Sequence, residues 1–227
     1  MKTSHPAADI FVPDSKLTPE AALARTTHLC VAAHQDDIEI MAYHGIAACF
    51  GRSDRWFSGV VVTNGAGSPR SGLYASYTDA DMQAVRVREQ RKAAVIGEYS
   101  VQLQLAHPSS AVKDPRNADV AADLDRIFTT ASAEVVYLHQ PADKHDTHVA
   151  VFGHALAALR RLPATLRPKR VYGCEVWRAL DWLPDADKQV LDVSAYPNVA
   201  ASLVGVFDSQ ISGGKRYDLA TAGRRLA

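Results

Sequence analysis

The apolar segment of residues 26–33 reads TTHLCVAA and runs directly into the polar cluster HQDDIE of residues 34–39. A short apolar run that ends in polar residues is typical of a strand buried inside a parallel sheet. In folds built on such sheets, ligands bind beyond the carboxyl ends of the strands. The polar cluster therefore stands where an open α/β sheet places its functional residues.

Strands and helices are expected to alternate along most of the chain, because short apolar runs alternate with segments of helical spacing. This order implies βαβ units in a Rossmann-like α/β fold: a single domain with a mostly parallel sheet and helices on both faces. The predicted strands are residues 26–33, 55–63, 101–106, 134–139 and 170–177, with a further one at 189–193, and the predicted helices are residues 38–50, 79–96, 117–131, 147–162 and 198–209.

The first 25 residues contain three prolines and predict an N-terminal arm with at most a short helix at 19–22. Residues 26–227 are expected to form the domain, since a chain of 227 residues fits one α/β domain better than two. The opening stretch lacks the apolar region of a secretory signal, so we expect a soluble, cytoplasmic protein.

The composition excludes several classes of function. Lys and Arg total 25 and Asp and Glu total 25, so the formal net charge is zero, which argues against binding to nucleic acid or to an anionic membrane. No apolar run approaches the roughly 20 residues of a membrane span. Cys30, Cys49 and Cys174 stand among apolar residues and predict buried, reduced thiols. No segment specifies an oligomeric state, and a homo-oligomer stays open.

A second polar cluster, PADKHDTH at residues 141–148, follows the predicted strand 134–139. A catalytic zinc ion needs three His or carboxylate ligands and an open position for water. His34, Asp37 and His148 meet that count, which leaves Asp36 free to act on the water. Taken alone, each cluster is more typical of a helix cap or a surface turn than of a metal site, but two such clusters at strand ends favour a metal site. A site with two His and one Asp accepts several divalent ions, so Fe²⁺ and Co²⁺ stay open beside Zn²⁺.

These motifs resemble those of a known family. AHQDDIE at residues 33–39 resembles the AHPDDxE signature of the PIG-L/LmbE-like deacetylases, and PADKHDTH resembles their DxHxxH signature. The resemblance runs from Thr26 to Gln210, and its weaker parts are VVVTNGAGS at 60–68, the RxxE pattern at 86–89 and DSQ at 208–210.

The resemblance implies a zinc-dependent enzyme on a Rossmann-like fold that removes acyl groups from N-acylated amino sugars and related small molecules. It makes the three candidate ligands named above the metal ligands and Asp36 the general base. His145 would stabilise or protonate the tetrahedral intermediate, and Asp143 would orient His145.

The chain departs from the family pattern at three places. Gln35 replaces the usual proline of AHPDD, the bulkier Tyr43 and His44 replace a glycine-rich stretch, and Asp208 replaces the His of a late segment. These departures open an alternative in which the same metal site acts on a non-sugar N-acyl intermediate of secondary-metabolite or thiol-cofactor biosynthesis. A non-catalytic ligand-binding module on the same fold is a further alternative.

Other residues are candidates for contact with substrate. Arg86 and Arg88, on the predicted helix 79–96, could bind an anionic or sugar substrate or belong to a solvated face. The Gly- and Ser-rich loop 65–77 is either a substrate lid or a plain surface loop. Trp177 could line the pocket or pack in the core. The sequence names no partner for His139, which we expect to be structural or exposed.

Overall fold

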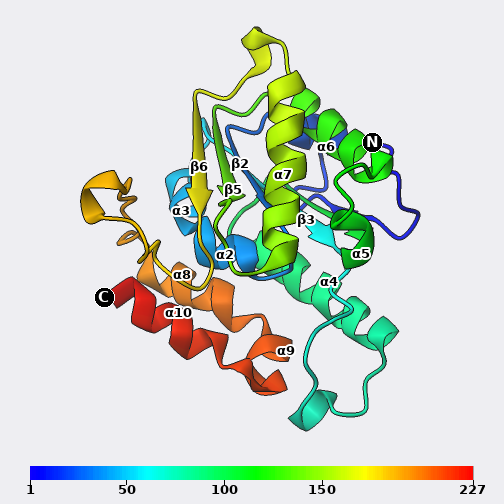
Figure 1. Ribbon diagram of the computed structural model, residues 1–227, viewed down its shortest axis with the longest axis vertical. Coiled ribbons are helices and arrows are strands. Elements are labelled where there is room, and N and C mark those ends of the chain that lie inside the picture. Colours follow the sequence, from blue (N-terminus) through cyan, green and yellow to red (C-terminus); the bar gives the residue numbers. More distant parts are fainter. Residues whose placement is uncertain (227) are drawn as a thin grey trace.

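A six-stranded sheet forms the centre of the protein in the computed structural model, which describes residues 1–226 (Figure 1). The order across the sheet is β1-β4-β3-β2-β5-β6, where β1 pairs antiparallel with β4 and the other neighbours pair in parallel. The strands are β1 (Asp9–Phe11), β2 (His28–Ala32), β3 (Phe57–Thr63), β4 (Val101–His107), β5 (Val135–His139) and β6 (Arg170–Cys174).

Helices cover both faces of this sheet. Helices α1, α6 and α7 pack on one face, and α2, α3, α4 and α8 pack on the other, so the expected Rossmann-like arrangement is confirmed. Figure 1 shows the C-terminal α10 beside α8. The helices are α1 (Pro19–Ala24), α2 (Asp37–Met41), α3 (Tyr43–Cys49), α4 (Asp79–Ile96), α5 (Ser109–Val112), α6 (Ala118–Ala131), α7 (Asp146–Arg161), α8 (Pro197–Gly205), α9 (Asp208–Gln210) and α10 (Tyr217–Leu226), with short turns η1 (Gly72–Tyr74), η2 (Ala164–Leu166), η3 (Asp185–Asp187) and η4 (Ile211–Lys215).

The central strand β2 divides the core between the two faces. Successive side chains of a strand point to opposite faces, and here Leu29 and Val31 enter the layer under α6 and α7, whereas Cys30 and Ala32 enter the layer under α2 and α3. Because both faces are covered, the whole strand is buried, which explains its continuous apolar run.

The strand order creates a switch point between β2 and β5. From β2 the chain moves outward to β3 and then β4, and it returns to place β5 on the other side of β2. The segments that follow β2 and β5 therefore leave the same edge of the sheet toward opposite faces. Such a crevice at the carboxyl ends of parallel strands is where α/β folds bind ligands.

Three predicted elements differ in the structure. The helix predicted at 38–50 is two helices, since the backbone leaves helical geometry at Ala42. The helix predicted at 198–209 ends at Gly205, and the backbone of Phe207, with a ψ of 59°, is not helical. The segment 189–193 is not a strand: Leu191 and Val193 pack on the core without a backbone partner, so their alternation reflects packing alone.

The N-terminal residues contribute to this architecture. Residues 9–11 of the predicted arm form the edge strand β1, and Ser4 donates hydrogen bonds from its backbone and its hydroxyl to Asp123 of α6 at 2.9 and 3.0 Å. The three cysteines are buried and free, as predicted. Among residues 1–226, no helix is both long enough and apolar enough to cross a membrane.

Replacing Leu103 with Ala should remove a large part of the core packing. Leu103 lies in β4 and is fully buried. A Leu→Ala change at such a site lowers the free energy of unfolding by about 2–5 kcal/mol. The matched change Leu219→Ala, at a side chain that is 60% exposed, should cost at most about 0.5 kcal/mol. Urea denaturation of the two variants measures the difference, and equal losses would contradict this assignment of the core.

Candidate active site

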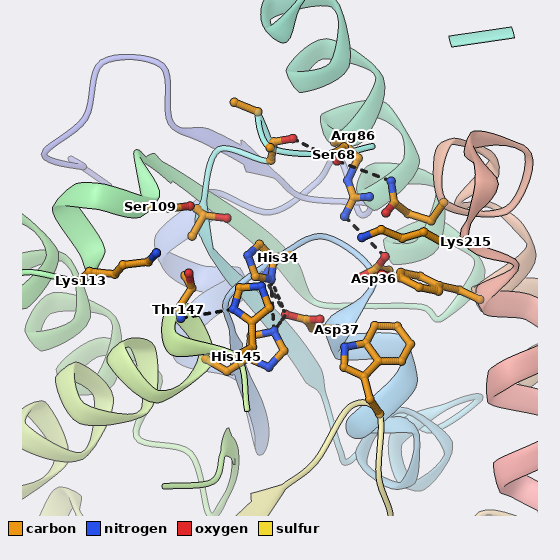
Figure 2. Close-up of a pocket in the computed structure, with 18 residues that line it drawn as sticks. His34, Asp36, Asp37, Ser68, Arg86, Ser109, Lys113, His145, Thr147 and Lys215 are labelled. Carbon is orange, nitrogen blue, oxygen red and sulfur yellow. Dashed lines mark hydrogen bonds and ion pairs between the residues drawn. The ribbon is translucent and has the colours of Figure 1, made fainter. Parts of the chain in front are cut away.

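The candidate residues converge at the switch point of the sheet. His34, Asp36 and Asp37 follow β2, and Asp143, His145 and His148 follow β5. In the parallel pairing of the two strands, Val31 is opposite Leu138, so the segments after them begin at the same level. Figure 2 shows His34, Asp37 and His145 gathered in the middle of one cavity.

Three ligand-type atoms form a small triangle. His34 Nδ1 lies 3.2 Å from Asp37 Oδ2 and 3.3 Å from His148 Nε2, and His148 Nε2 lies 3.4 Å from Asp37 Oδ2. Ligands at the usual zinc distances of about 2.0–2.1 Å are about 3.3–3.4 Å apart in a tetrahedral site. The triangle therefore has the dimensions of one face of a zinc tetrahedron, and the residues present fit a divalent ion.

Charge at this triangle also favours a cation. Burial opposes the ionisation of Asp37, but the imidazoles of His148 and His34 outweigh it and hold the pKa of that carboxyl well below its usual range. Burial likewise opposes protonation of His148, yet Asp37 and Asp143 raise the pKa of its ring. A buried carboxylate thus draws positive charge to the point where the two imidazole lone pairs meet.

Asp143 holds one of these ligands in place. Its Oδ2 lies 3.0 Å from Nδ1 of His148, and its Oδ1 accepts a hydrogen bond from the backbone N–H of His145 at 2.9 Å. A proton on Nδ1 of His148 leaves Nε2 free to face the centre, which is how carboxylates orient metal-binding histidines. We expected Asp143 to orient the ring of His145; the structure places its carboxylate against the ring of His148 instead.

His145 stands at the beginning of α7 with about half of its side chain exposed. Its Nδ1 accepts a hydrogen bond from the backbone N–H of Thr147 at 3.3 Å, which leaves Nε2 for the cavity. Its ring stacks on that of His148, with centroids 4.5 Å apart. Burial and the neighbouring imidazoles of His148 and His34 lower the pKa of His145, so the neutral ring that carries a proton on Nε2 is favoured.

Asp36 has the properties expected of a general base. It is buried, its φ of 87° lies in a region that few residues other than glycine adopt, and its Oδ2 accepts no hydrogen bond from residues 1–226. Burial raises its pKa, and the guanidinium of Arg86, with Nη2 3.5 Å from Oδ2, acts in the opposite direction. A divalent cation beside it would further favour the ionised carboxylate.

The two arginines that we predicted to bind substrate differ in position. Arg86 is buried in the cavity wall, where it donates to the backbone oxygen of Gln35 and lies beside Asp36. Arg88 is exposed and lines a separate hollow with Tyr77 and Asp81. The structure therefore does not bring Arg88 to the site, whereas the guanidinium of Arg86 lies beside the carboxylate of Asp36.

His139 belongs to the site although no partner could be predicted for it. It is fully buried at the end of β5, and its ring stacks on His148 with centroids 4.0 Å apart. Its Nε2 lies 3.5 Å from Asp37 Oδ2, but it accepts a hydrogen bond from the backbone N–H of Ala33 at 2.9 Å. Because this bond occupies the nitrogen lone pair, His139 fixes the segment after β2 rather than serving as a ligand.

A cavity of about 270 Å³ opens over the triangle. The loop after β3 and the C-terminal segment form its walls, and Trp177 lines it rather than packing wholly in the core. Its lining residues are His34, Asp36, Asp37, Thr63, Gly65, Ala66, Gly67, Ser68, Arg86, Ser109, Lys113, His145, Thr147, His148, Trp177, Gln210, Lys215 and Tyr217.

The residues that depart from the family pattern lie outside this lining. The hydroxyl of Tyr43 donates to the backbone oxygens of Ala195 and Tyr196, and His44 Nδ1 lies 2.7 Å from the hydroxyl of Tyr137. Gln35 is buried and donates to Gln104. Asp208 likewise does not line the cavity. These substitutions therefore do not shape the cavity directly.

Residues 29–159 match the family described as PIG-L, GlcNAc-PI de-N-acetylase. The chain belongs to this family. The matched residues run from β2 to α7, so they contain both polar clusters of the site. No curated protein sequence shows significant similarity to the chain.

Solved structures share the PIG-L fold of this chain at low sequence identity. The conserved protein TT1542 from Thermus thermophilus superposes with a TM-score of 0.65 at 20% identity, over 88% of this chain and 87% of that one. N,N'-diacetylchitobiose deacetylase from Pyrococcus horikoshii has a TM-score of 0.62 at 16% identity, over 82% and 70%. GalB, the 4-carboxy-2-hydroxymuconate hydratase from Pseudomonas putida, has a TM-score of 0.62 at 18% identity, over 88% and 85%.

Removing the carboxylate of Asp143 should weaken metal binding without unfolding the protein. Loss of such a supporting group typically lowers metal affinity by about 10–100-fold. Titration of metal-free Asp143→Ala with Zn²⁺ measures this loss. Asp146→Ala removes a nearby acid that faces Lys113 rather than a ligand, so its affinity should stay within about threefold of the wild type. Wild-type affinity in Asp143→Ala would contradict the role of Asp143.

Proposed function

We propose that the protein is a metal-dependent N-deacylase that removes an acyl group, most simply acetyl, from an N-acylated amino sugar or a related small molecule. The triangle formed by His34 Nδ1, Asp37 Oδ2 and His148 Nε2 carries the proposal, because its sides of 3.2–3.4 Å fit a zinc tetrahedron. Zn²⁺ suits this donor set, as do Fe²⁺ and Co²⁺. A divalent ion at this point supplies Lewis-acid activation of water and of the acyl carbonyl.

Asp36 is the proposed base. Asp36 lines the cavity one residue from a proposed ligand, and its buried Oδ2 has no hydrogen-bond partner within residues 1–226, so it can accept a proton from the water that attacks the carbonyl. Arg86 opposes the effect of burial and favours the ionised carboxylate, and a divalent ion at the triangle would favour it further. The strained backbone at Asp36 aims its carboxylate into the cavity, whereas Asp37 faces the triangle.

His145 is the proposed donor on the opposite side. One ring nitrogen of each of His34, His145 and His148 lies within 4.8 Å of the other two. Its Nε2–H can donate to the carbonyl oxygen as negative charge develops there, an effect typically worth about 10²–10³ in rate. The amine that leaves needs a proton, because an amide C–N bond breaks only after its nitrogen is protonated, and Asp36 can deliver the proton that it accepts from the water.

The fold alone does not select this chemistry, since both a deacetylase and a hydratase have similar structures. The family of the chain supports deacylation. A non-catalytic binding module is disfavoured because Asp36 and His145 accompany all three ligand residues in one cavity. Action on a non-sugar N-acyl compound would use the same residues and differ only in the outer cavity.

Replacing Asp36 with Asn should keep the metal and abolish most turnover. Asn has the same shape and tolerates positive φ, but it cannot accept a proton. Acetate release from N-acetylglucosamine and N,N'-diacetylchitobiose by the zinc-loaded protein should fall by about 10²–10⁴-fold.

The exposed Asp54 provides a matched control for this experiment. Asp54→Asn should release acetate at the wild-type rate, and both variants should hold as much zinc as the wild type. Wild-type turnover in Asp36→Asn with its zinc retained would exclude Asp36 as the base. A zinc-loaded wild type that releases no acetate from any N-acetylated amino sugar would overturn the proposed function.

A further inference from the structure

Lys215 is a cation of the cavity without a counter-ion. Figure 2 shows its side chain reaching into the cavity toward Asp36 and Arg86. The two other cations that line the cavity have partners: Arg86 lies beside Asp36, and Lys113 pairs with Asp146 at 2.7 Å. Lys215 makes no ion pair with any residue of the described chain, 1–226.

The backbone that presents Lys215 is held in place. Gly214 has a φ of 110°, and a Cβ there would lie 2.7 Å from the hydroxyl of Ser71, so the segment needs glycine at this position. The segment is anchored on two sides. Ser209 donates to Glu89 of α4 at 2.8 and 2.7 Å, and the hydroxyl of Tyr74 donates to Asp208 at 2.6 Å.

The hydrogen bond between Tyr74 and Asp208 attaches the loop 65–77 to the segment that carries Lys215. The loop packs against the segment that carries Lys215, and its Ser68 accepts a hydrogen bond from Gln210 at 3.5 Å. Loop and segment together form one wall of the cavity. The backbone position of Lys215 is therefore built into the fold.

The charge of the cavity favours an anion near Lys215. Its lining holds three cations against two carboxylates, Asp36 and Asp37. A divalent ion at the triangle adds further positive charge. Partial burial lowers the pKa of Lys215, with Asp36 acting in the opposite direction. The residue as a whole is exposed, so an anion from solution can reach its ammonium group.

An aromatic surface lies next to this cation. The rings of Trp177 and Tyr217 have centroids 4.2 Å apart, and Nζ of Lys215 lies 5.0 Å from the centroid of Tyr217. Both aromatic residues line the cavity. Aromatic side chains supply apolar contact area for the ring of a ligand, so a ring-shaped ligand on this surface would bring its substituents close to Lys215.

We propose that the substrate carries an anionic group, a phosphate or a carboxylate, that binds Lys215 while its ring packs on Trp177 and Tyr217. This inference rests on the proposed deacylase function, which it narrows to anionic N-acyl compounds. A lysine binds such groups as a point charge. From the usual strength of hydrogen bonds to charged groups, we expect the anionic substrate to be preferred over its uncharged analogue by about 10–100-fold.

Three substrates test the inference on the zinc-loaded protein. N-acetylglucosamine 6-phosphate supplies a phosphate, N-acetylmuramic acid supplies a carboxylate, and N-acetylglucosamine is uncharged. We expect kcat/KM to be about 10–100-fold higher for one of the two anionic sugars than for N-acetylglucosamine. The better of the two identifies the anionic group. Equal kcat/KM values for all three would overturn the inference and leave the deacylase function intact.

Variants assign the preference to Lys215. Lys215→Met should lower kcat/KM for the preferred anionic sugar by about 10–100-fold more than for N-acetylglucosamine, mainly through KM. Lys215→Arg should retain most of the preference. Lys92→Met removes a lysine on the exposed face of α4 and should keep the wild-type preference. A Lys215→Met variant with wild-type melting temperature and wild-type preference would overturn the inference.

A binding measurement separates this inference from the proposed function. Calorimetry with glucosamine 6-phosphate and glucosamine needs no deacylation. Tighter binding of the phosphorylated amine, lost in Lys215→Met, would support the anion site even if no acetate were released, in which case only the deacylase proposal would fail. Equal binding of the two amines, together with no preference for N-acetylmuramic acid, would overturn the anion site.

Discussion

Three atoms with lone pairs, two imidazole nitrogens and one carboxylate oxygen, lie within 3.4 Å of one another at the carboxyl ends of β2 and β5. Only a shared proton or a cation relieves the repulsion among such lone pairs. The parallel pairing of β2 with β5 sets this meeting point, because it starts both polar segments at the same edge of the sheet. The remaining features of the site surround this point.

Hydrogen bonds and charge interactions from the surrounding groups stabilise this polar site inside a buried crevice. Asp143 and His139 fix the ligands, Asp143 through the ring of His148 and His139 through the backbone of Ala33. Arg86 lies beside the buried carboxylate of Asp36, a residue of the cavity lining. A buried polar cluster of this kind is stable only when most of its members have partners, so the few that lack one are candidates for contact with substrate or water.

The sequence was sufficient to predict strands β2 to β6, the helices on both faces and the proximity of His34, Asp37 and His148, because these follow from short-range patterns and from the rule that strand ends hold ligands. It missed the edge strand β1 and added a strand at 189–193 that is absent. It could not distinguish Arg86 from Arg88. Residues two apart on a helix point in nearly opposite directions. The buried face of α4 includes Arg86, Glu89 and Gln90 among its apolar residues, so no continuous apolar stripe marks it. The partner of Asp143 and the role of His139 depend on contacts between segments that the spacing of residues does not reveal.

Metal content tests the central claim most directly. Wild type, His148→Ala and His44→Ala can be purified without chelator, offered Zn²⁺, desalted and subjected to elemental analysis. His44 contacts Tyr137 and lies outside the cavity lining. The arrangement of ligands predicts about one zinc ion per chain in the wild type and in His44→Ala, and none in His148→Ala. A wild type that binds no ion, or a His148→Ala variant that retains it in full, would contradict the metal centre from which the proposed function is derived.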